Sequence, residues 1–197
     1  MTKQTTKWLL IASLALVGSF QARANLVSNG DFEVPSLANP AYDYLNGTQL
    51  TDWTIFSPHN GIVHFGSAYR PVGGGLYSVQ IEYPGDSISQ SLATLVGATY
   101  RFSIDLSTYD TSAGKLGVSL TGAAFQSFDG TPSYVNHSFD FVATSTTTVL
   151  TLSSLNFYPH IDNVSVEALS SVPDMGSTML LLTSSCMGLA FIRRRMR

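Results

Sequence analysis

The sequence predicts an all-β domain of the two-sheet sandwich or jelly-roll class. Apolar residues alternate with polar ones in many short runs, in which β-branched and aromatic residues dominate, as is typical of half-buried strands. No stretch between Asn25 and Ser171 has the 3.6-residue period of a convincing amphipathic helix. The alternating positions are Trp53 and Ile55; Val79, Ile81 and Tyr83; Tyr100, Phe102, Ile104 and Leu106; Phe139 and Phe141; Val149, Leu150 and Leu152; and Ile161, Val164 and Val166.

Turn sequences separate these runs. Glycine, proline, asparagine and aspartate gather there because they adopt the backbone conformations that tight turns require. Many short strands at this spacing predict two sheets packed face to face. No internal repeat or linker divides residues 25–171, so we expect a single domain. The turn sequences are Asn46-Gly47, Asn60-Gly61, Gly73-Gly74-Gly75, Pro84-Gly85-Asp86 and Asp129-Gly130.

The N-terminus has the layout of a secretory signal peptide over residues 1–24. A basic start and an apolar run over residues 8–20 precede Ala22-Arg23-Ala24, which matches the A-x-A cleavage pattern. Cleavage there would make Asn25 the first residue of the mature chain. The alternative is an uncleaved N-terminal anchor, which the short apolar run and the cleavage pattern disfavour.

A second apolar segment predicts a transmembrane helix over about residues 175–192. The run from Met179 to Ile192 has 14 residues, which is about 21 Å as a helix and short for a bilayer core of about 30 Å. Starting at Met175 gives 18 residues, enough to span when the arginines of the basic end, residues 193–197, reach the interface. This orientation satisfies the positive-inside rule. A plain membrane anchor and a buried helix that ends in arginines are the alternatives.

The domain between these two segments is acidic. Residues 25–171 hold three basic residues, Arg70, Arg101 and Lys115, against 12 acidic ones, which gives a net charge of −9. Such a surface argues against nucleic acid and anionic membranes as partners and suits calcium or neutral partners better. Cys186, the only cysteine, lies in the C-terminal run. The domain therefore has neither a disulfide nor a thiolate zinc site.

The order of short motif, apolar run and basic end resembles the PEP-CTERM sorting signals. Residues 172–178 resemble the VPDSG variant, with Met175 where serine is commoner. The resemblance implies a Gram-negative bacterium whose exosortase recognises the motif in the inner membrane and removes the tail. The mature protein would then reach the cell surface or the exopolysaccharide matrix. The residues assigned to the signal are Val172, Pro173, Asp174, Gly176, Ser177 and Thr178 in the motif and Arg193, Arg194 and Arg195 in the basic end.

Four segments of the domain carry a second resemblance, which covers nearly all of residues 25–168. They are an opening strand at 25–33, a short tryptophan strand at 51–54, a hairpin from 86–92 to 97–102, and a closing strand at 161–166. Together they resemble the choice-of-anchor C proteins and related galactose-binding-like jelly rolls. The resemblance implies a jelly-roll fold and association with polysaccharide.

The same resemblance implies a structural calcium ion, because related carbohydrate-binding modules hold one where the first and last strands lie close together. Glu33 of the opening segment and Asp162 of the closing segment would supply carboxylates, and backbone carbonyls would complete the oxygen shell. The alternative is that Glu33 hydrogen-bonds a turn while Asp162 ends a strand.

Aromatic side chains are the candidate ligand contacts, since sugars stack on aromatic faces. Trp53 and Tyr100 alternate with polar neighbours and are expected in the core instead. Arg70, beside Tyr69 and three glycines, would grip a hydroxylated or carboxylated sugar or form a surface salt bridge. The tyrosines expected in loops and assigned to a glycan surface are Tyr42, Tyr44, Tyr69 and Tyr109.

These patterns predict an exported, non-catalytic surface protein that binds glycan or serves as matrix scaffold. The sequence contains no G-x-S-x-G motif, and its four histidines form no zinc-binding pattern. One alternative is a structural or adhesive surface protein with protein partners. The other is a polysaccharide-active enzyme, which would require two acids facing each other across a groove.

Overall fold

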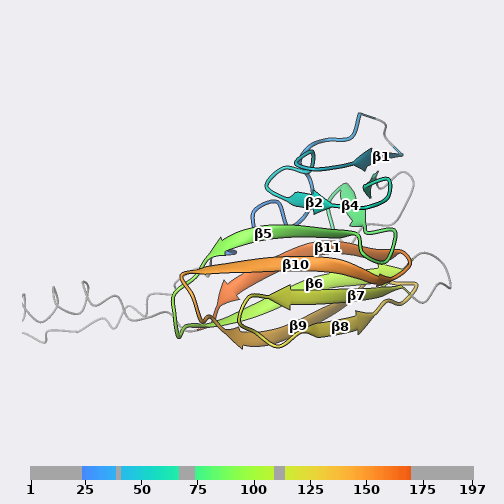
Figure 1. Ribbon diagram of the computed structural model, residues 1–197. Coiled ribbons are helices and arrows are strands. Elements are labelled where there is room, and N and C mark those ends of the chain that lie inside the picture. Colours follow the sequence, from blue (N-terminus) through green and yellow to red (C-terminus); the bar gives the residue numbers. More distant parts are fainter. Residues whose placement is uncertain (1–23, 39–40, 67–73, 109–113, 170–197) are drawn as a thin grey trace, which may run out of the picture.

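The computed structural model describes residues 24–38, 41–66, 74–108 and 114–169. Within these ranges the chain forms eleven strands and no helix, arranged as two antiparallel sheets packed face to face (Figure 1). The predicted all-β sandwich is therefore confirmed. The strands are β1 (Tyr42–Leu45), β2 (Thr54–Phe56), β3 (Ile62–Gly66), β4 (Tyr77–Gln80), β5 (Ser87–Ala93), β6 (Thr99–Thr108), β7 (Lys115–Leu120), β8 (Gln126–Asp129), β9 (Val135–Val142), β10 (Thr147–Asn156) and β11 (Pro159–Ala168).

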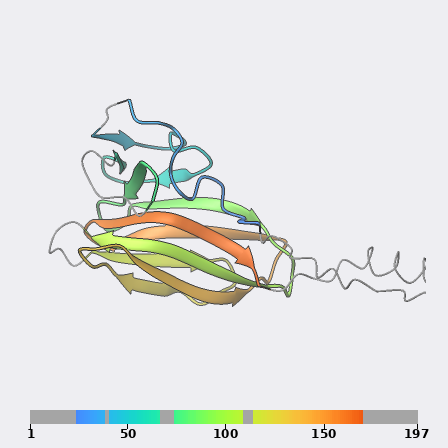
Figure 2. The same ribbon diagram turned by 180° about the vertical axis from the view of Figure 1, so that it is seen from behind.

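The strand order shows that the chain crosses repeatedly from one sheet to the other. The six-stranded sheet has the order β1-β3-β4-β11-β6-β9, and the five-stranded sheet has the order β2-β5-β10-β7-β8. Figure 2 shows the molecule from the other side, with β11 and β6 adjacent in the six-stranded sheet. Such pairing of strands that are distant in sequence is typical of jelly rolls.

The predicted hairpin of residues 86–92 and 97–102 is wrong. β5 pairs with β2 and β10, whereas β6 pairs with β11 and β9, so the two strands lie in different sheets. Each strand has one apolar face, which must point into the space between the sheets. When the chain passes over the end of the sandwich from one sheet to the other, the apolar faces of both strands still point inside. The chain therefore does not need to form a hairpin within one sheet.

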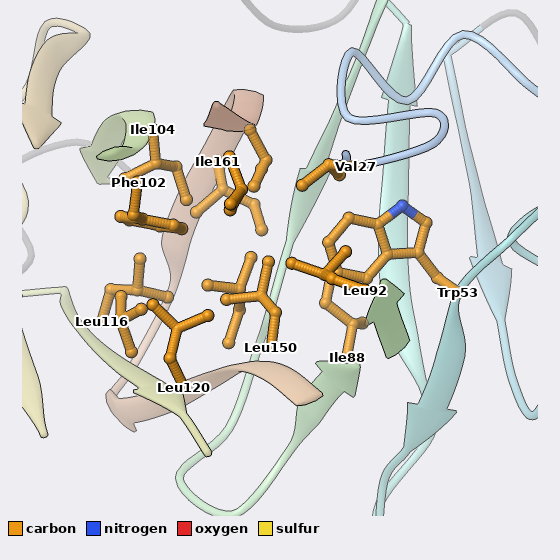
Figure 3. Close-up of a cluster of buried hydrophobic side chains, with 14 of the residues drawn as sticks. Val27, Trp53, Ile88, Leu92, Phe102, Ile104, Leu116, Leu120, Leu150 and Ile161 are labelled. Atoms are coloured by element: carbon orange, nitrogen blue, oxygen red, sulfur yellow. The ribbon is translucent and has the colours of Figure 1, made fainter. Parts of the chain in front are cut away.

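The core fills the space between the two sheets (Figure 3). In β6, Phe102 and Ile104 alternate with more exposed neighbours and are fully buried. Leu116, Leu120 and Leu150 approach them from the five-stranded sheet (Figure 3). Burying a side chain of this size stabilises the fold by roughly 1.5–3 kcal/mol. The alternation of apolar and polar residues along these strands therefore predicts which side chains form the core.

Trp53 closes the core at the end near Val27 (Figure 3). Its side chain is 2% exposed, its ring centroid lies 5.7 Å from that of Phe32, and its Nε1 donates a hydrogen bond to the carbonyl of Asn29 at 3.0 Å. The indole is thus buried without an unpaired N–H group. The predicted core positions of Trp53 and Tyr100, the latter 3% exposed, are both confirmed.

The opening segment, residues 25–33, forms one bridge and a set of turns instead of the predicted strand. Asn25 bridges Glu167, and the N–H of Leu26 donates to the carbonyl of Val166 at 2.8 Å. Beyond this point Asn29 and Phe32 have φ values of 49° and 55°, which a regular strand does not accommodate. The strand prediction is wrong, but the expected closeness of the first and last segments is confirmed.

Two of the strands that the alternation pattern missed, β1 and β3, lie side by side in the six-stranded sheet. β1 holds Tyr42 and Tyr44, which were expected in a loop, and it pairs with β3 at the edge of that sheet. All five residues of β3 are buried, so its sequence shows no period of two. A short edge strand and a fully buried strand both lack the alternation that marks a half-buried one.

No helix in the part of the chain that the structure describes is long and apolar enough to cross a bilayer. The predicted signal peptide, residues 1–24, lies outside that part except for Ala24. The predicted sorting signal at 172–197, with its transmembrane helix at about 175–192, lies wholly outside it.

Candidate functional site

A pocket with a volume of about 330 Å³ opens where β1, β3 and β4 meet the turn that precedes β11. Strand register brings its walls together. Tyr42 pairs with Phe65 and Tyr44 with Val63. Val63 in turn pairs with Gln80. Paired residues point to the same face of a sheet, so all five side chains share one face. The lining residues are Tyr42, Tyr44, Val63, Phe65, Gln80, Glu82 and Tyr158.

Tyr42 and Tyr44 form the aromatic wall of the pocket. Their side chains are 36% and 50% exposed, with ring centroids 6.0 Å apart and planes at 88°. Tyr42 also lies 5.8 Å from the ring of Phe65, which holds it against the sheet. Partial burial, together with the nearby charge of Glu82, raises the pKa of Tyr44. Its phenol therefore stays protonated at neutral pH and keeps its hydrogen-bond donor.

Gln80 and Glu82 form the polar side of the pocket. They are only 3% and 8% exposed, and Gln80 Nε2 donates to Glu82 Oε1 at 3.3 Å. Burial raises the pKa of Glu82 and the charge of Asp86 raises it further, while the hydrogen bond from Gln80 opposes them. Gln80 Oε1 is buried and has no hydrogen-bond partner within the described chain. A buried acceptor of this kind is normally satisfied by water or a ligand.

The pocket therefore offers two kinds of contact side by side. Half-exposed tyrosine rings present apolar faces and hydroxyl groups, and buried amide and carboxyl oxygens accept hydrogen bonds. In small-molecule sites, placed polar groups of this kind fix the orientation of the ligand. A ligand with flat apolar faces and hydroxyl donors at its rim matches this arrangement.

Of the five residues that the sequence assigned to ligand binding, the structure brings two together. Tyr42 and Tyr44 line one pocket. Tyr69, Arg70 and Tyr109 lie outside the described residues, so their assignment stays a prediction.

The sequence reasoning did not assign Gln80, Glu82 and Tyr158 to the site. A signal for the first two was present, because Gln80 and Glu82 alternate with the buried Val79 and Ile81. Polar residues at this period mark the other face of the same strand. Tyr158 reaches the site through the turn before β11, where its φ is 66°. That placement depends on the fold and has no local signature.

Glu33 and Asp162, the predicted calcium ligands, both bind the segment that leads into β4. Glu33 Oε1 accepts hydrogen bonds from the N–H groups of Leu76 at 2.6 Å and Tyr77 at 3.0 Å. Asp162 Oδ2 accepts one from the N–H of Gly74 at 2.9 Å. The two carboxylates thus hold one turn at both of its ends, which gives Glu33 the alternative role that its sequence allowed.

These hydrogen bonds bear on the fit of a calcium ion. Backbone N–H groups donate to Glu33 Oε1 and to both carboxylate oxygens of Asp162. The Oδ1 atom of Asp162 accepts its hydrogen bond from the N–H of Asn163 at 2.7 Å. Calcium takes about six to eight oxygen ligands. Among the described residues no group of three or more histidine, cysteine, aspartate or glutamate side chains is placed to hold a metal ion. The two carboxylates are placed to bind backbone amides and fit calcium less well. The calcium ion stays a prediction.

Ser57, His59 and Asp86 are the residue types of a catalytic triad in a different geometry. Asp86 is fully buried, and its Oδ1 accepts from Ser57 Oγ at 2.7 Å and from His59 Nδ1 at 3.0 Å. In a triad the histidine lies between the nucleophile and the acid, whereas Asp86 lies between the other two here. Ser57 Oγ also accepts from the N–H groups of His59 and Gly61. The group therefore holds a turn.

The fold places the protein in the class of jelly-roll β-sandwiches to which carbohydrate-binding modules belong. It is similar to TmCBM61 in complex with beta-1,4-galactotriose, with a TM-score of 0.51 and 14% identity over 73% of this chain and 97% of that one. It is also similar to the CBM22-1-CBM22-2 tandem domain of Xyn10C from Paenibacillus barcinonensis. There the TM-score is 0.52 and the identity 16%, over 78% of this chain and 49% of that one. At these identities the similarity concerns the fold.

The chain belongs to the family described as "Protein of unknown function (DUF642)", whose profile matches residues 25–167. The match covers the whole predicted domain except its last few residues. No curated protein matches the chain.

Proposed function

We propose that the protein is a non-catalytic glycan-binding protein and that the pocket at Tyr42 and Tyr44 is its binding site. One observation carries the proposal: two half-exposed tyrosine rings stand beside the buried oxygens of Gln80 and Glu82. A sugar ring has flat C–H faces and a rim of hydroxyl groups, so the aromatic and polar walls match its two kinds of surface.

The solved structures of similar fold support the same class of ligand. One of those proteins holds beta-1,4-galactotriose. The other comes from Xyn10C, whose CBM22-1 module is named a xylan-binding domain. Galactan and xylan are therefore sensible first members of a polysaccharide panel, together with the exopolysaccharide of the host. The identity of the glycan is what the panel is meant to find.

The test compares polysaccharide binding by the full-length protein in detergent with binding by two variants. Tyr44→Ala removes an exposed ring of the pocket, and we expect affinity to fall by about tenfold, the effect of losing one aromatic contact. Phe56→Ala is the matched control, because Phe56 is a 65% exposed aromatic residue on β2 and does not line the pocket. If the Tyr44→Ala variant bound polysaccharide with the same affinity as the wild type, the assignment of this pocket as the binding site would be wrong.

The absence of catalysis is part of the proposal and is checked in the same incubations. The geometry at Ser57, His59 and Asp86 favours a structural role for these three residues. We expect no new reducing ends to be released from any polysaccharide that binds. Their release by purified protein would favour a polysaccharide-active enzyme instead.

Export and sorting are proposed from the sequence of the two chain ends. The signal-peptide layout of residues 1–24 and the tripartite tail of residues 172–197 support passage through the inner membrane and processing by an exosortase. The mature form would reside at the surface or in the matrix of a Gram-negative bacterium. Mass spectrometry of protein from the host tests this: it should begin at Asn25 and end within residues 172–178.

A structural or adhesive role with a protein partner is the second candidate. Phe125 and Leu155 are 57% and 41% exposed and both lie over Gly117 on the five-stranded sheet. A methyl group at Gly117 would come within 2.8 Å of the Phe125 ring and 3.1 Å of Leu155. Exposed apolar side chains that lie this close together favour protein contact over sugar binding. Failure of every polysaccharide to bind would leave this candidate as the better one.

A further inference from the structure

One end of the sandwich is formed by turns that contain no charged residue. The β5–β6, β7–β8 and β9–β10 turns meet there (Figure 1). Thr94 and Gly97 donate backbone hydrogen bonds to the carbonyls of Thr146 and Ala143 at 3.0 and 2.8 Å. Gly122 lies against the side chain of Thr144. The uncharged stretches, which lack Asp, Glu, Lys, Arg and His, are residues 91–100, 116–128 and 141–157.

This lack of charge is unusual for a domain whose net charge is −9. The charged side chain nearest in sequence to the β7–β8 turn is Asp129, at the far end of β8, and those nearest to the β5–β6 and β9–β10 turns are Arg101 and Asp140. They neutralise each other, with Arg101 Nε and Nη2 at 2.8 and 3.0 Å from the two carboxylate oxygens. Glu167 lies opposite Arg101 on β11. Arg101, Asp140 and Glu167 together carry a net charge of −1, so most of the acidic character of the domain lies elsewhere on its surface.

Apolar side chains project from the same end. Leu95 and Val96 are 58% and 64% exposed at the tip of the β5–β6 turn, and Val142 is 51% exposed where β9 ends. The tip is well ordered by hydrogen bonds. The N–H of Ala98 donates to the carbonyl of Leu95 at 3.0 Å, and Gly97 has a φ of 80°, as a type II turn requires. Two neighbouring apolar side chains are thus held outward on a rigid turn.

The described chain ends beside this tip. The N–H of Leu169 donates to the carbonyl of Thr99 at 2.8 Å, next to the β5–β6 turn. Five residues, 170–174, lie between Leu169 and Met175, where the predicted transmembrane helix begins. Even with this segment fully extended, the distance from Leu169 to Met175 is only about 20 Å. A domain tethered this closely must hold its uncharged end near the bilayer whenever the helix is embedded.

We propose that the end of the sandwich bearing Leu95, Val96 and Val142 docks on the lipid surface of the membrane that holds the C-terminal helix. The inference rests on the anchoring part of the proposed function and is independent of the glycan pocket. Apolar side chains at a headgroup boundary lose contact with water, which favours docking. The acidic rest of the domain is repelled by anionic lipids, so the uncharged end is the part of the domain that can approach the membrane.

Docking in this way orients the candidate pocket away from the membrane. Tyr158 precedes β11 and Leu169 follows it, so the pocket and the docking end lie at opposite ends of this strand. Its ten residues span about 33 Å. In the anchored precursor the pocket would therefore face away from the bilayer and stay open to solvent.

The experiment uses the full-length chain in phosphatidylcholine vesicles that carry lipids with a quencher in their acyl chains. Cys186 is replaced by serine, and single cysteines introduced as Val96→Cys, Val142→Cys or Val135→Cys are labelled with a fluorophore. Val135 is the matched control, because it is a 44% exposed valine at the other end of β9 from Val142. We expect labels at 96 and 142 to lose most of their fluorescence and the label at 135 to keep it.

Equal quenching at positions 96 and 135, or none at 96, would overturn the proposal. A label on Cys186 of the wild-type chain shows which step failed. If it is quenched, the helix is embedded but the domain does not dock. If it is not quenched, the tail is no anchor and the premise itself is wrong. Glycan binding in detergent is measured separately, so its failure is distinguishable from both.

Discussion

Gln80, the last residue of β4, donates a hydrogen bond from its Nε2 to Oε1 of Glu82 at 3.3 Å, and both side chains are almost fully buried beside the tyrosines of the pocket. This pair links the proposed site to the stability of the fold. The glutamine supplies one donor to the carboxyl group, and its own carbonyl oxygen is left without a partner within the described chain. Such a pair is costly to bury unless something completes its hydrogen bonds.

The Glu82→Gln variant should be more stable than the wild type at neutral pH. Burial raises the pKa of Glu82 in the folded protein, so the folded state holds its proton more tightly than the unfolded state. Wild-type stability therefore falls as the pH rises from the unfolded pKa of 4.5 through the raised folded value. Glutamine resembles the protonated acid and lacks this penalty.

Thermal melts of both proteins between pH 4 and pH 8 measure the effect. The melting temperature of the variant should exceed that of the wild type by a few degrees at pH 7, and the difference should shrink toward pH 4. A difference that is constant with pH would show that ionisation of Glu82 does not govern it.

The Glu33→Ala variant should destabilise the turn before β4. It leaves the N–H groups of Leu76 and Tyr77 without their acceptor, and because both lie where water can reach them, the loss is that of the net hydrogen bonds, about 1 kcal/mol each. Glu33→Gln is the matched control because its amide oxygen can still accept both hydrogen bonds. We expect denaturant unfolding to show a lower free energy of unfolding for the alanine variant than for the glutamine variant.

Melting with calcium and with EDTA separates this role from the predicted metal site. If Glu33 and Asp162 act only as amide acceptors, EDTA leaves the wild-type melting temperature unchanged. A fall in melting temperature with EDTA, reversed by calcium and lost in Glu33→Gln, would instead support the calcium site that the family resemblance implies.

His64 should make the domain less stable in weak acid. The side chain is fully buried, and its Nε2 donates to the carbonyl of Phe32 at 2.8 Å. Burial lowers its pKa below 6.5, so the unfolded state takes up a proton more readily than the folded one. The stability associated with the neutral ring is fully present above pH 6.5 and is lost as the pH falls below that value toward the folded pKa.

The pH dependence of unfolding in His64→Gln checks this. Glutamine can donate the same hydrogen bond but does not titrate, so we expect a smaller loss of stability between pH 7 and pH 5 than in the wild type. His137→Gln serves as the control, since His137 lies on the edge strand β9 and is only partly buried. An unchanged slope in His64→Gln would mean that another group causes the loss.

Part of the fold could be read from sequence because it depends on local pattern. The alternation of Tyr100, Phe102, Ile104 and Leu106 predicts one buried face, and β6 buries all four. β3 could not be read in this way, because every one of its residues is buried and no face is polar. The hairpin expected between residues 86–92 and 97–102 failed because a turn sequence does not specify whether the chain stays in one sheet.

The candidate site was likewise predicted only in part, because only some of its residues can be recognised from the local sequence. Tyrosine is a recognisable sugar contact wherever it occurs, so Tyr42 and Tyr44 could be named from the sequence. Gln80 and Glu82 gain their role from being buried beside those rings, and burial of a polar side chain is not visible in a local pattern. The amide-binding role of Glu33 was open in the sequence as an alternative, and only the position of the turn before β4 shows it.

The sequence by itself determined the class of fold, the acidity of the domain and the apolar character of both chain ends, because each is a property of composition or of neighbouring residues. Only the tertiary structure decided that β1, β3, β4 and the start of β11 lie side by side, and hence that residues as far apart as Tyr42 and Tyr158 line one pocket. Strand order arises from pairing between distant segments, whose register is set by burial of apolar faces across the whole domain. No local pattern carries that information.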